Sequence, residues 1–223
     1  MIDAAVEAIR TGAPETLRRV LAASPNLATA RPDGARTLLH VATDHPGHLP
    51  EIARTVLVLV EAGADVNAPF AGAHAETPLH WAASNDDVPA VDALVAAGAD
   101  VSAPGSVIDG GTPLADAVAF GQWNAAHRLL EHGADPNLWQ AAALGLLSRV
   151  QALTDPVPAR SELSNALWCA AHGGHQNTAA HLLALGADLN WVGHDNLTPL
   201  DAARRSNFPT MAIWLESHGA HPT

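Results

Sequence analysis

Apolar residues along this chain follow a helical period, in short stretches that glycines separate. Within the first 27 residues, Leu17, Val20 and Leu21 lie on one face of a predicted helix, and Gly12 falls at the turn before it. Apolar positions three or four residues apart line one side of an α-helix. The N-terminal stretch therefore predicts two short helices that meet at Gly12.

The segment Thr77 Pro78 Leu79 His80 has the residues of a helix start. A threonine hydroxyl caps the N-terminus of a helix, and proline fits the first helical position. Leu79 is then expected in the core, and His80 can bond neighbouring backbone. Gly98, in Gly-Ala-Asp, can take the left-handed conformation that ends a helix. These residues predict one helix pair.

The helix start, Thr-Pro-Leu-His, and the close of the pair, Gly-Ala-Asp, both recur along the chain with substitutions. The closing glycine comes 21 residues after the first residue of the start in four units. The unit that starts at Thr37 needs 26 residues, which predicts five extra residues near 44–48, between its two helices. The related starts are Thr37–His40, Thr112–Ala115, Asn165–Trp168 and Thr198–Asp201, and the related closes are Gly63–Asp65, Gly133–Asp135, Gly186–Asp188 and Gly219–His221.

These starts and closes resemble those of ankyrin repeat proteins of a bacterial type, over nearly the whole chain. The resemblance implies an all-α fold, an ankyrin-repeat solenoid of about seven helix-turn-helix units with finger loops and a degenerate fifth unit. We expect a single domain over 1–223. Its predicted parts are an N-terminal capping unit at 1–36, repeats at 37–76, 77–111 and 112–135, the degenerate repeat at 136–164, a repeat at 165–197 and a C-terminal capping repeat at 198–223.

The fifth unit departs from the repeat pattern. Alignment of Gly145 with the glycines of neighbouring units predicts a first helix over 138–144. Asp135 leads through Pro136 almost directly into that helix, so we expect its finger loop to be missing. Residues 153–158 replace the Gly-Ala-Asp close.

Composition and charge narrow the classes of partner. The formal net charge is −12 and all 11 basic residues are arginine. Nucleic acid is therefore an unexpected partner, because phosphate binding needs clustered positive charge. No apolar stretch is long enough to span a membrane and Met1 to Arg10 lack a signal-peptide pattern, which predicts a cytoplasmic protein without a membrane partner. Cys169 is the only cysteine, so an intramolecular disulfide is excluded.

Residues at the same distance from the helix start in successive repeats line up across the surface formed by the first helices and the finger loops. Asp116 is the unusual member, because a carboxylate stands where apolar or neutral residues usually pack. The fingers after Asp65 and Asp100 are two residues longer than the one after Asp188, and they carry Phe70 and Val107. The predicted binding residues are Trp81, Asn85, Asp116, Phe120, Gln140, Trp168, His172 and Trp191.

Each group of candidates also has a structural explanation. Trp123 and Trp214 fall at second-helix offsets and are expected in the core. Trp139 and Trp168 are placed where the start has its histidine, which favours core packing over ligand contact. Trp81, on a first helix, and Trp191, on a finger, are the stronger contact candidates.

The 13 histidines do not predict a metal site. His40 and His80 are explained by the helix start, and others precede closing glycines, where helix ends need hydrogen bonds. No ligand pattern of paired cysteines or His-Glu-x-x-His occurs. We expect no metal and no cofactor.

Two residue pairs could carry chemistry. Cys169 and His172 share a helical face, which suits a thiolate with its base, although a lone cysteine is more often a small buried side chain. Asp116 and His172 could act as acid and base.

Three functions follow from these residues. The first is a protein-binding module that recognises a partner protein through its concave surface. The alternative is a small-molecule-binding or catalytic protein with a Trp, Asp and His pocket near the fifth unit, for which a buried and perturbed Asp116 would be the signature. A plain scaffold is the third.

Overall fold

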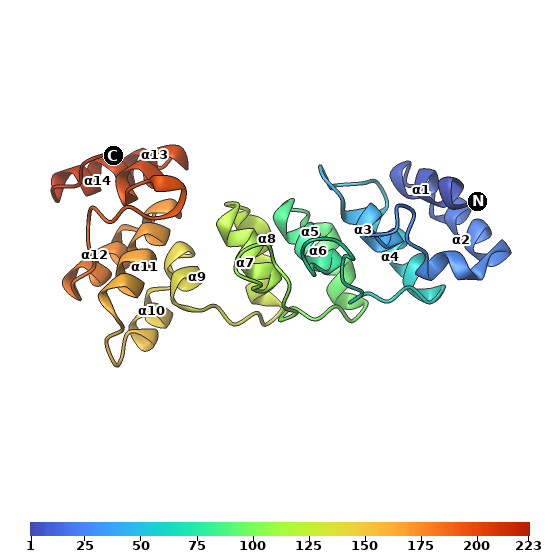
Figure 1. The fold of residues 1–223 in the computed structure, drawn as a ribbon, viewed down its shortest axis with the longest axis horizontal. Helices are drawn as coiled ribbons and strands as arrows, with labels where there is room; N and C mark the ends of the chain where they lie inside the picture. Colours follow the sequence, from blue (N-terminus) through green and yellow to red (C-terminus); the bar gives the residue numbers. More distant parts are fainter. The chain divides into compact units, whose positions relative to one another are not determined.

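The structure of the protein is a computed structural model that describes all residues from Met1 to Thr223. It contains helices and no strands (Figure 1). None of the helices is long and apolar enough to cross a membrane. The α-helices are α1 (Ile2–Arg10), α2 (Pro14–Ala23), α3 (Leu38–Thr43), α4 (Ile52–Glu61), α5 (Pro78–Ser84), α6 (Val88–Ala96), α7 (Pro113–Ala119), α8 (Trp123–Glu131), α9 (Leu138–Ala143), α10 (Leu147–Leu153), α11 (Arg160–His172), α12 (Gln176–Ala184), α13 (Pro199–Arg205) and α14 (Pro209–Ser217), with short 3-10 helices η1 (Pro25–Thr29) and η2 (His194–Asn196).

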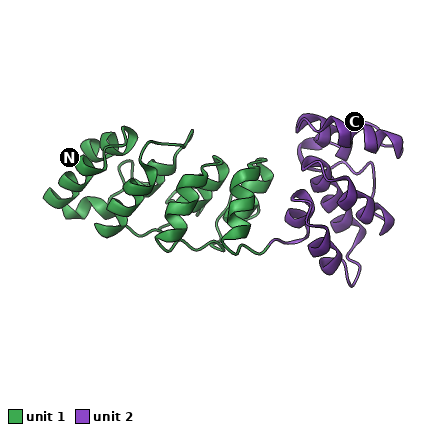
Figure 2. Cartoon of the chain, turned by 180° about the vertical axis from the view of Figure 1, so that it is seen from behind, with its two compact units in different colours: residues 1–135 green, residues 136–223 purple.

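The helices form seven successive pairs, distributed over two compact units (Figure 2). Unit 1 is Met1–Asp135 and unit 2 is Pro136–Thr223. In unit 1 the first helices α1, α3, α5 and α7 pack in chain order, and so do the second helices α2, α4, α6 and α8. In unit 2, α11 packs between α9 and α13. The predicted all-α stack of about seven helix pairs is confirmed, whereas the single domain stays a prediction.

The helix starts have the predicted structure. Thr77 is the N-cap of α5, Pro78 is its first residue and Leu79 is fully buried. The Thr77 amide donates to His80 Nδ1 at 3.0 Å, so Nε2 is the ring nitrogen that carries the proton. The same arrangement begins α3, where the Thr37 amide donates to His40 Nδ1.

The protonated histidine nitrogens bond the next repeat. His40 Nε2 donates to the carbonyl of Glu76 at 3.0 Å, and His80 Nε2 donates to the carbonyl of Gly111 at 3.3 Å. Each acceptor is the last residue before the next helix start. Trp168 Nε1 makes the equivalent bond in unit 2, to the Leu197 carbonyl at 2.9 Å. We call these three contacts the cross-repeat hydrogen bonds.

The closing glycines end the second helices in the predicted left-handed conformation. The φ angle of Gly98 is +94°, and a Cβ added there would meet no atom within 4 Å. The corresponding angles at Gly63, Gly133, Gly186 and Gly219 lie between +91° and +98°. Backbone conformation alone therefore favours glycine at Gly98.

The register predicted for the fifth unit is wrong by one residue. The N-cap of α9 is Asn137, and Gln140 completes its capping box by accepting from the Asn137 amide at 3.0 Å. Gln140 therefore takes the place of the histidine in the helix start, and Trp139 does not. The alignment of Gly145 placed the start one residue too early, because α9 has six residues whereas α7 has seven.

The expected helix start at Asn165 is also wrong, because α11 already begins at Arg160. Residues 160–164 contain no proline or glycine, so nothing in the sequence stops the helix from extending toward Pro158. Inside α11, the Ser164 hydroxyl donates to the Arg160 carbonyl at 2.8 Å and accepts from the Asp188 amide at 2.9 Å. The start at Asn165 thus lacks a cap of its own.

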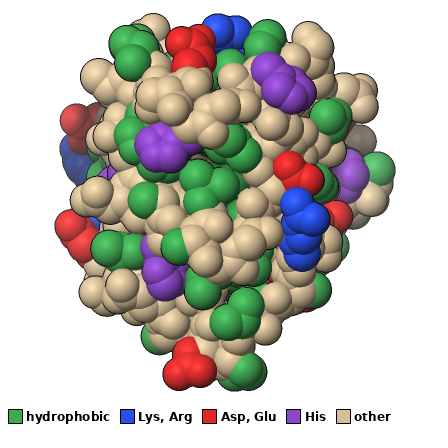
Figure 3. All heavy atoms as spheres, turned by 90° about the vertical axis from the view of Figure 1, so that its left-hand side faces the viewer, with side chains coloured by type: hydrophobic (Ala, Val, Ile, Leu, Met, Phe, Trp, Pro, Cys, Tyr) green, Lys and Arg blue, Asp and Glu red, His purple; other side chains and the backbone are tan.

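The acidic charge is concentrated in unit 1. Residues 1–135 contain 17 Asp and Glu against seven Arg, a formal charge of −10, whereas residues 136–223 contain six against four, a charge of −2. On the face drawn in Figure 3, acidic and basic side chains occur singly or next to one another, with apolar and histidine side chains between them. A positively charged partner is therefore attracted mainly by unit 1.

Candidate functional site

The predicted binding residues fall into two groups, one within each unit. Unit 1 contains Trp81, Asn85, Asp116 and Phe120, and unit 2 contains Gln140, Trp168, His172 and Trp191. The hydrogen bonds described for these residues each join residues of one unit. The two sets are therefore described as separate candidate sites.

The unit 1 site is built around the carboxyl group of Asp116. This side chain is fully buried in α7, and its Oδ1 accepts a hydrogen bond of 2.5 Å from the Ser106 hydroxyl. Ser106 lies in the finger before α7, and its oxygen also accepts from the Ile108 amide at 2.8 Å. Asp116 Oδ2 is buried and receives no hydrogen bond. The finger thus supplies a donor to one carboxyl oxygen only.

Burial raises the pKa of Asp116 from 3.8 to about 7, because a charged carboxylate loses its hydration there. The Ser106 hydrogen bond opposes this increase, and the Glu76 carboxyl group adds to it through its charge and a side-chain interaction. Asp116 and Glu76 therefore form an acid pair in which one proton is retained near neutral pH. Asp116 is therefore buried and has a perturbed pKa, as expected for the small-molecule or catalytic alternative.

Aromatic rings adjoin the acid pair. Trp81, half-buried on α5, donates its indole N–H to Glu76 Oε2 at 3.1 Å. The Phe70 ring from the preceding finger lies 5.4 Å from the Trp81 ring, and the His40 ring lies 4.9 Å from it, edge to face. Burial lowers the pKa of His40 to about 4, so this imidazole is neutral at pH 7.

Sequence reasoning missed Glu76 and Ser106. Both lie in finger loops, where the repeat pattern does not specify a residue. Only the unusual carboxylate of Asp116 indicated that these loops contain functional residues. A buried acid needs a donor nearby, so a serine in the adjacent finger was the available signal.

Phe120 and Asn85 have different surroundings. Phe120 is 51% exposed at the C-terminal end of α7, and Val107 is 38% exposed on the finger before it. Asn85 holds the insertion of the second repeat, since its amide donates to the Thr43 carbonyl at 2.9 Å. The extra residues lie between α3 and α4, as predicted.

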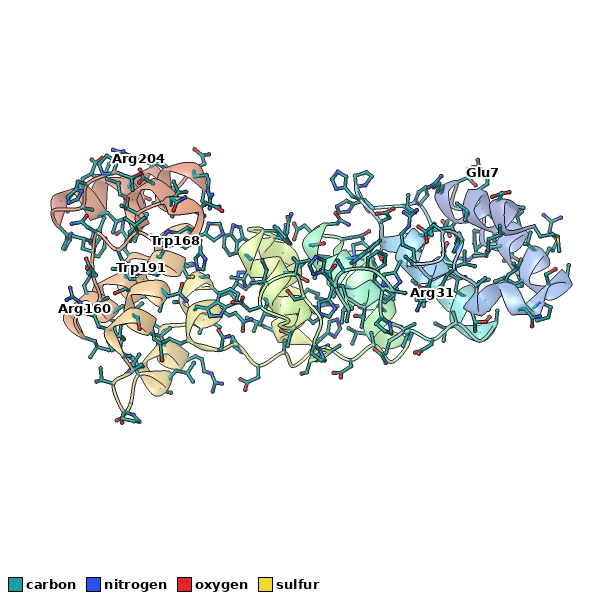
Figure 4. All side chains as sticks on the ribbon, in the orientation of Figure 1. Glu7, Arg31, Arg160, Trp168, Trp191 and Arg204 are labelled. Carbon is teal, nitrogen blue, oxygen red and sulfur yellow. The ribbon has the colours of Figure 1, made fainter.

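The unit 2 site is centred on Trp168, which Figure 4 labels together with Trp191. The Trp168 ring stacks on His172 at 5.5 Å and meets His194 edge to face at 5.0 Å. The Arg205 guanidinium lies 5.8 Å from the centre of the same ring. Trp168 is 4% exposed and His172 is 8% exposed, so only His194 and Arg205 of this cluster are exposed at the surface.

Cys169 does not have the environment of a reactive thiol. Its side chain is buried, and burial raises the pKa of the thiol to about 12. His172 Nδ1 instead contacts the Ser206 hydroxyl at 2.7 Å. The thiolate and base pair is therefore disfavoured, and the small buried cysteine is the better description.

Two further cavities lie away from these residues. One of about 270 Å³ is lined by residues of α2 and α4, including Arg18 and Glu61. Another of about 430 Å³ lies where the insertion meets α6, and it is lined in part by His48 and Asp87. None of the predicted binding residues lines either cavity.

Comparison with known proteins agrees with the repeat pattern. A family model described as "Ankyrin repeats (3 copies)" matches residues 56–139, and one described as "Ankyrin repeat" matches residues 36–69. The crystal structure of the human ASB11 ankyrin repeat domain is similar to this chain, with a TM-score of 0.57 and 20% sequence identity, and the match covers 95% of this chain and 96% of that one. No curated protein matches the sequence.

Proposed function

We propose that this chain, whose residues 36–139 match ankyrin repeats, is a protein-binding module and that its unit 1 contacts a partner protein. Ankyrin repeats are generally protein-interaction modules. The contact surface that we propose consists of the exposed or half-buried apolar side chains of the first helices and fingers, and we call it the unit 1 face. Its members are Phe70, Trp81, Val107 and Phe120.

The observation that carries this proposal is the exposure of Phe120. Half of a large aromatic side chain is left in water at the end of a first helix, and the Val107 side chain on the finger before that helix is exposed as well. Aromatic residues are enriched at the centres of protein interfaces. Burial of such side chains by a partner would remove apolar area from water.

The catalytic alternative has its expected buried and perturbed Asp116, but no second group that would act with it. The raised pKa of Asp116 is accounted for within unit 1 by burial and by Glu76. His172 has its own partners, Ser206 and Trp168, within unit 2. Asp116 therefore does not need His172 to explain its environment, and we do not propose acid and base catalysis.

A pair of matched variants tests the proposal. Phe120 and Leu57 are both 51% exposed, but Leu57 lies on the second helix α4. We expect Phe120→Ser to lose proteins that wild type retains in a co-purification experiment, and Leu57→Ser to keep them. Quantitative mass spectrometry of the retained proteins measures this. Equal retention by both variants would contradict the proposed face.

A further inference from the structure

The acid pair of unit 1 joins two neighbouring fingers where their backbones touch. Glu76 is the last finger residue before α5, and Ser106, which bonds Asp116, lies in the finger before α7. A Cβ added at Gly105 would lie 2.3 Å from the Ala75 carbonyl oxygen, so the two fingers are in direct contact there. The ionisation state of the pair therefore acts on a contact between two fingers.

A single proton stabilises the contact between the two carboxyl groups. Asp116 Oδ2 is buried without another donor, and the Glu76 carboxyl group interacts with the Asp116 side chain. A protonated carboxyl group donates a hydrogen bond, whereas an ionised one only accepts. Loss of the proton therefore replaces a hydrogen bond with the repulsion of two charges.

Glu76 is the member of the pair whose side chain can move. It is 9% exposed, whereas Asp116 is fully buried. The Glu76 backbone is fixed, because its carbonyl accepts from the Phe70 amide at 2.7 Å and from His40 Nε2 at 3.0 Å. The Glu76 side chain has one donor, the Trp81 indole N–H at 3.1 Å. Rotation of this side chain toward solvent would separate the two charges and would break the bond to Trp81.

We propose that the acid pair is a pH-sensitive switch for Trp81, in which the shared proton keeps Glu76 bonded to the indole N–H and loss of that proton releases both side chains. The switch itself requires no partner. Its consequence for binding rests on the proposed function, because Trp81 belongs to the unit 1 face. A partner would meet a fixed Trp81 side chain at low pH, and a fixed side chain loses less conformational entropy on binding.

The direction of the pH effect follows from the number of protons that each form binds. Burial, with a smaller contribution from Glu76, raises the pKa of Asp116 to about 7 while the pair is in contact. In the released form water can reach Asp116, which lowers this pKa. The released form therefore binds fewer protons near pH 6. Release becomes more favourable by up to about tenfold for each pH unit, until both forms are ionised above pH 7.

The other charged or titratable groups on the surrounding helices do not supply this response. Burial lowers the pKa of His40 on α3 and of His80 on α5, so both imidazoles are neutral where the pair ionises. On α8, which also packs against α7, His127 is exposed and Arg128 bonds Asp92. A transition near pH 7 at Trp81 would therefore come from the acid pair.

The experiment measures exchange of the Trp81 indole hydrogen with solvent, by NMR of the full chain at pH 5 and pH 8. Trp81→Phe identifies this signal among the six tryptophans. Exchange detects a released form even when it is a minor population. The Trp168 indole N–H, which bonds the Leu197 carbonyl, is the reference within the same sample. Comparison of variants at one pH cancels the intrinsic pH dependence of exchange.

Two variants of the pair and one control separate the switch from a general loosening. Asp116→Asn and Glu76→Gln each place an amide donor between the two side chains at any pH. At pH 8 we expect the Trp81 indole hydrogen of wild type to exchange about tenfold faster, or more, than in either variant, and at pH 5 at a similar rate. Glu7→Gln removes one exposed charge from α1 and should behave as wild type. The Trp168 rate should be the same in all four proteins.

Equal Trp81 rates in wild type and Asp116→Asn at pH 8 would overturn the inference. So would a difference that is as large at pH 5, or one that Glu7→Gln also abolishes. If the proteins retained in co-purification still depend on Phe120 in that case, the proposed function stands and only the switch is rejected. If Trp81 responds as expected while that dependence is absent, the switch stands and the proposed function fails by itself.

Discussion

Replacement of Asp116 by asparagine should stabilise the protein, and more so as the pH rises. The wild-type carboxyl group has to keep a proton in the folded state or place a second charge beside Glu76. An asparagine side chain has nearly the same shape, and its amide can donate toward Glu76 while its oxygen accepts from Ser106. The variant therefore removes a cost that the wild type carries at neutral pH.

The size of the effect follows from the two pKa values. The pKa of Asp116 is about 7 in the folded protein, against 3.8 for an unperturbed side chain. Because the folded pKa is the higher one, the contribution of this group to stability is complete below pH 3.8 and is lost as the pH rises through 7. The difference of about three pKa units corresponds to about 4 kcal/mol at pH 8, and to less than about 1 kcal/mol at pH 4.

Urea unfolding of wild type and Asp116→Asn at pH 4, 6 and 8, followed by circular dichroism, measures this difference. Glu7→Gln is the control, because an exposed carboxylate should change the free energy of unfolding by less than about 0.5 kcal/mol at any of these pH values. An asparagine variant that is no more stable than wild type at pH 8 would refute the reasoning. A gain that is constant from pH 4 to pH 8 would refute it too, because the effect would then not come from ionisation.

Three further predictions concern the repeat framework. Trp168→Phe removes the donor to the Leu197 carbonyl and should lower the free energy of unfolding by about 1–3 kcal/mol in urea titrations, whereas unchanged stability would mean that the bond contributes nothing. Gly98→Ala should cost about 1 kcal/mol from its positive φ alone, since the added methyl group meets no atom, and Gly98→Asn should cost less in the same thermal unfolding assay. The Cys169 thiol should react with a thiol reagent at pH 8 only after unfolding, because burial raises its pKa, and a reaction as fast in buffer as in urea would contradict this.

The repeating parts of the fold could be predicted because they depend on local chemistry. Thr77 and Pro78 specify a helix start by capping and by backbone geometry, and Gly98 specifies a helix end by its positive φ. These effects need no knowledge of distant residues. The starts and closes therefore gave the helix pairs, and the change of spacing after Thr37 located the insertion between α3 and α4.

Contacts made by residues of the finger loops were harder to predict than the helix pairs. Asp116 stood out as unusual, but its partners Glu76 and Ser106 come from loops whose path the sequence does not determine. In the fifth unit the missing finger removed the reference for counting. The spacing to Gly145 placed the start at Pro136, and the capping bond between Asn137 and Gln140 shows that it is Asn137.

The cross-repeat hydrogen bonds have a consequence for how such a chain can change in length. Their donors are side chains, but their acceptors are main-chain carbonyls, which every residue possesses. Deletion of residues 77–111 would leave His40 opposite the same Glu76 carbonyl, with Thr112 following directly. Whole repeats can thus be duplicated or lost without matching substitutions in their neighbours. The acid pair, in contrast, needs Glu76 and Asp116 at their present separation and would be lost if residues 77–111 were deleted or duplicated.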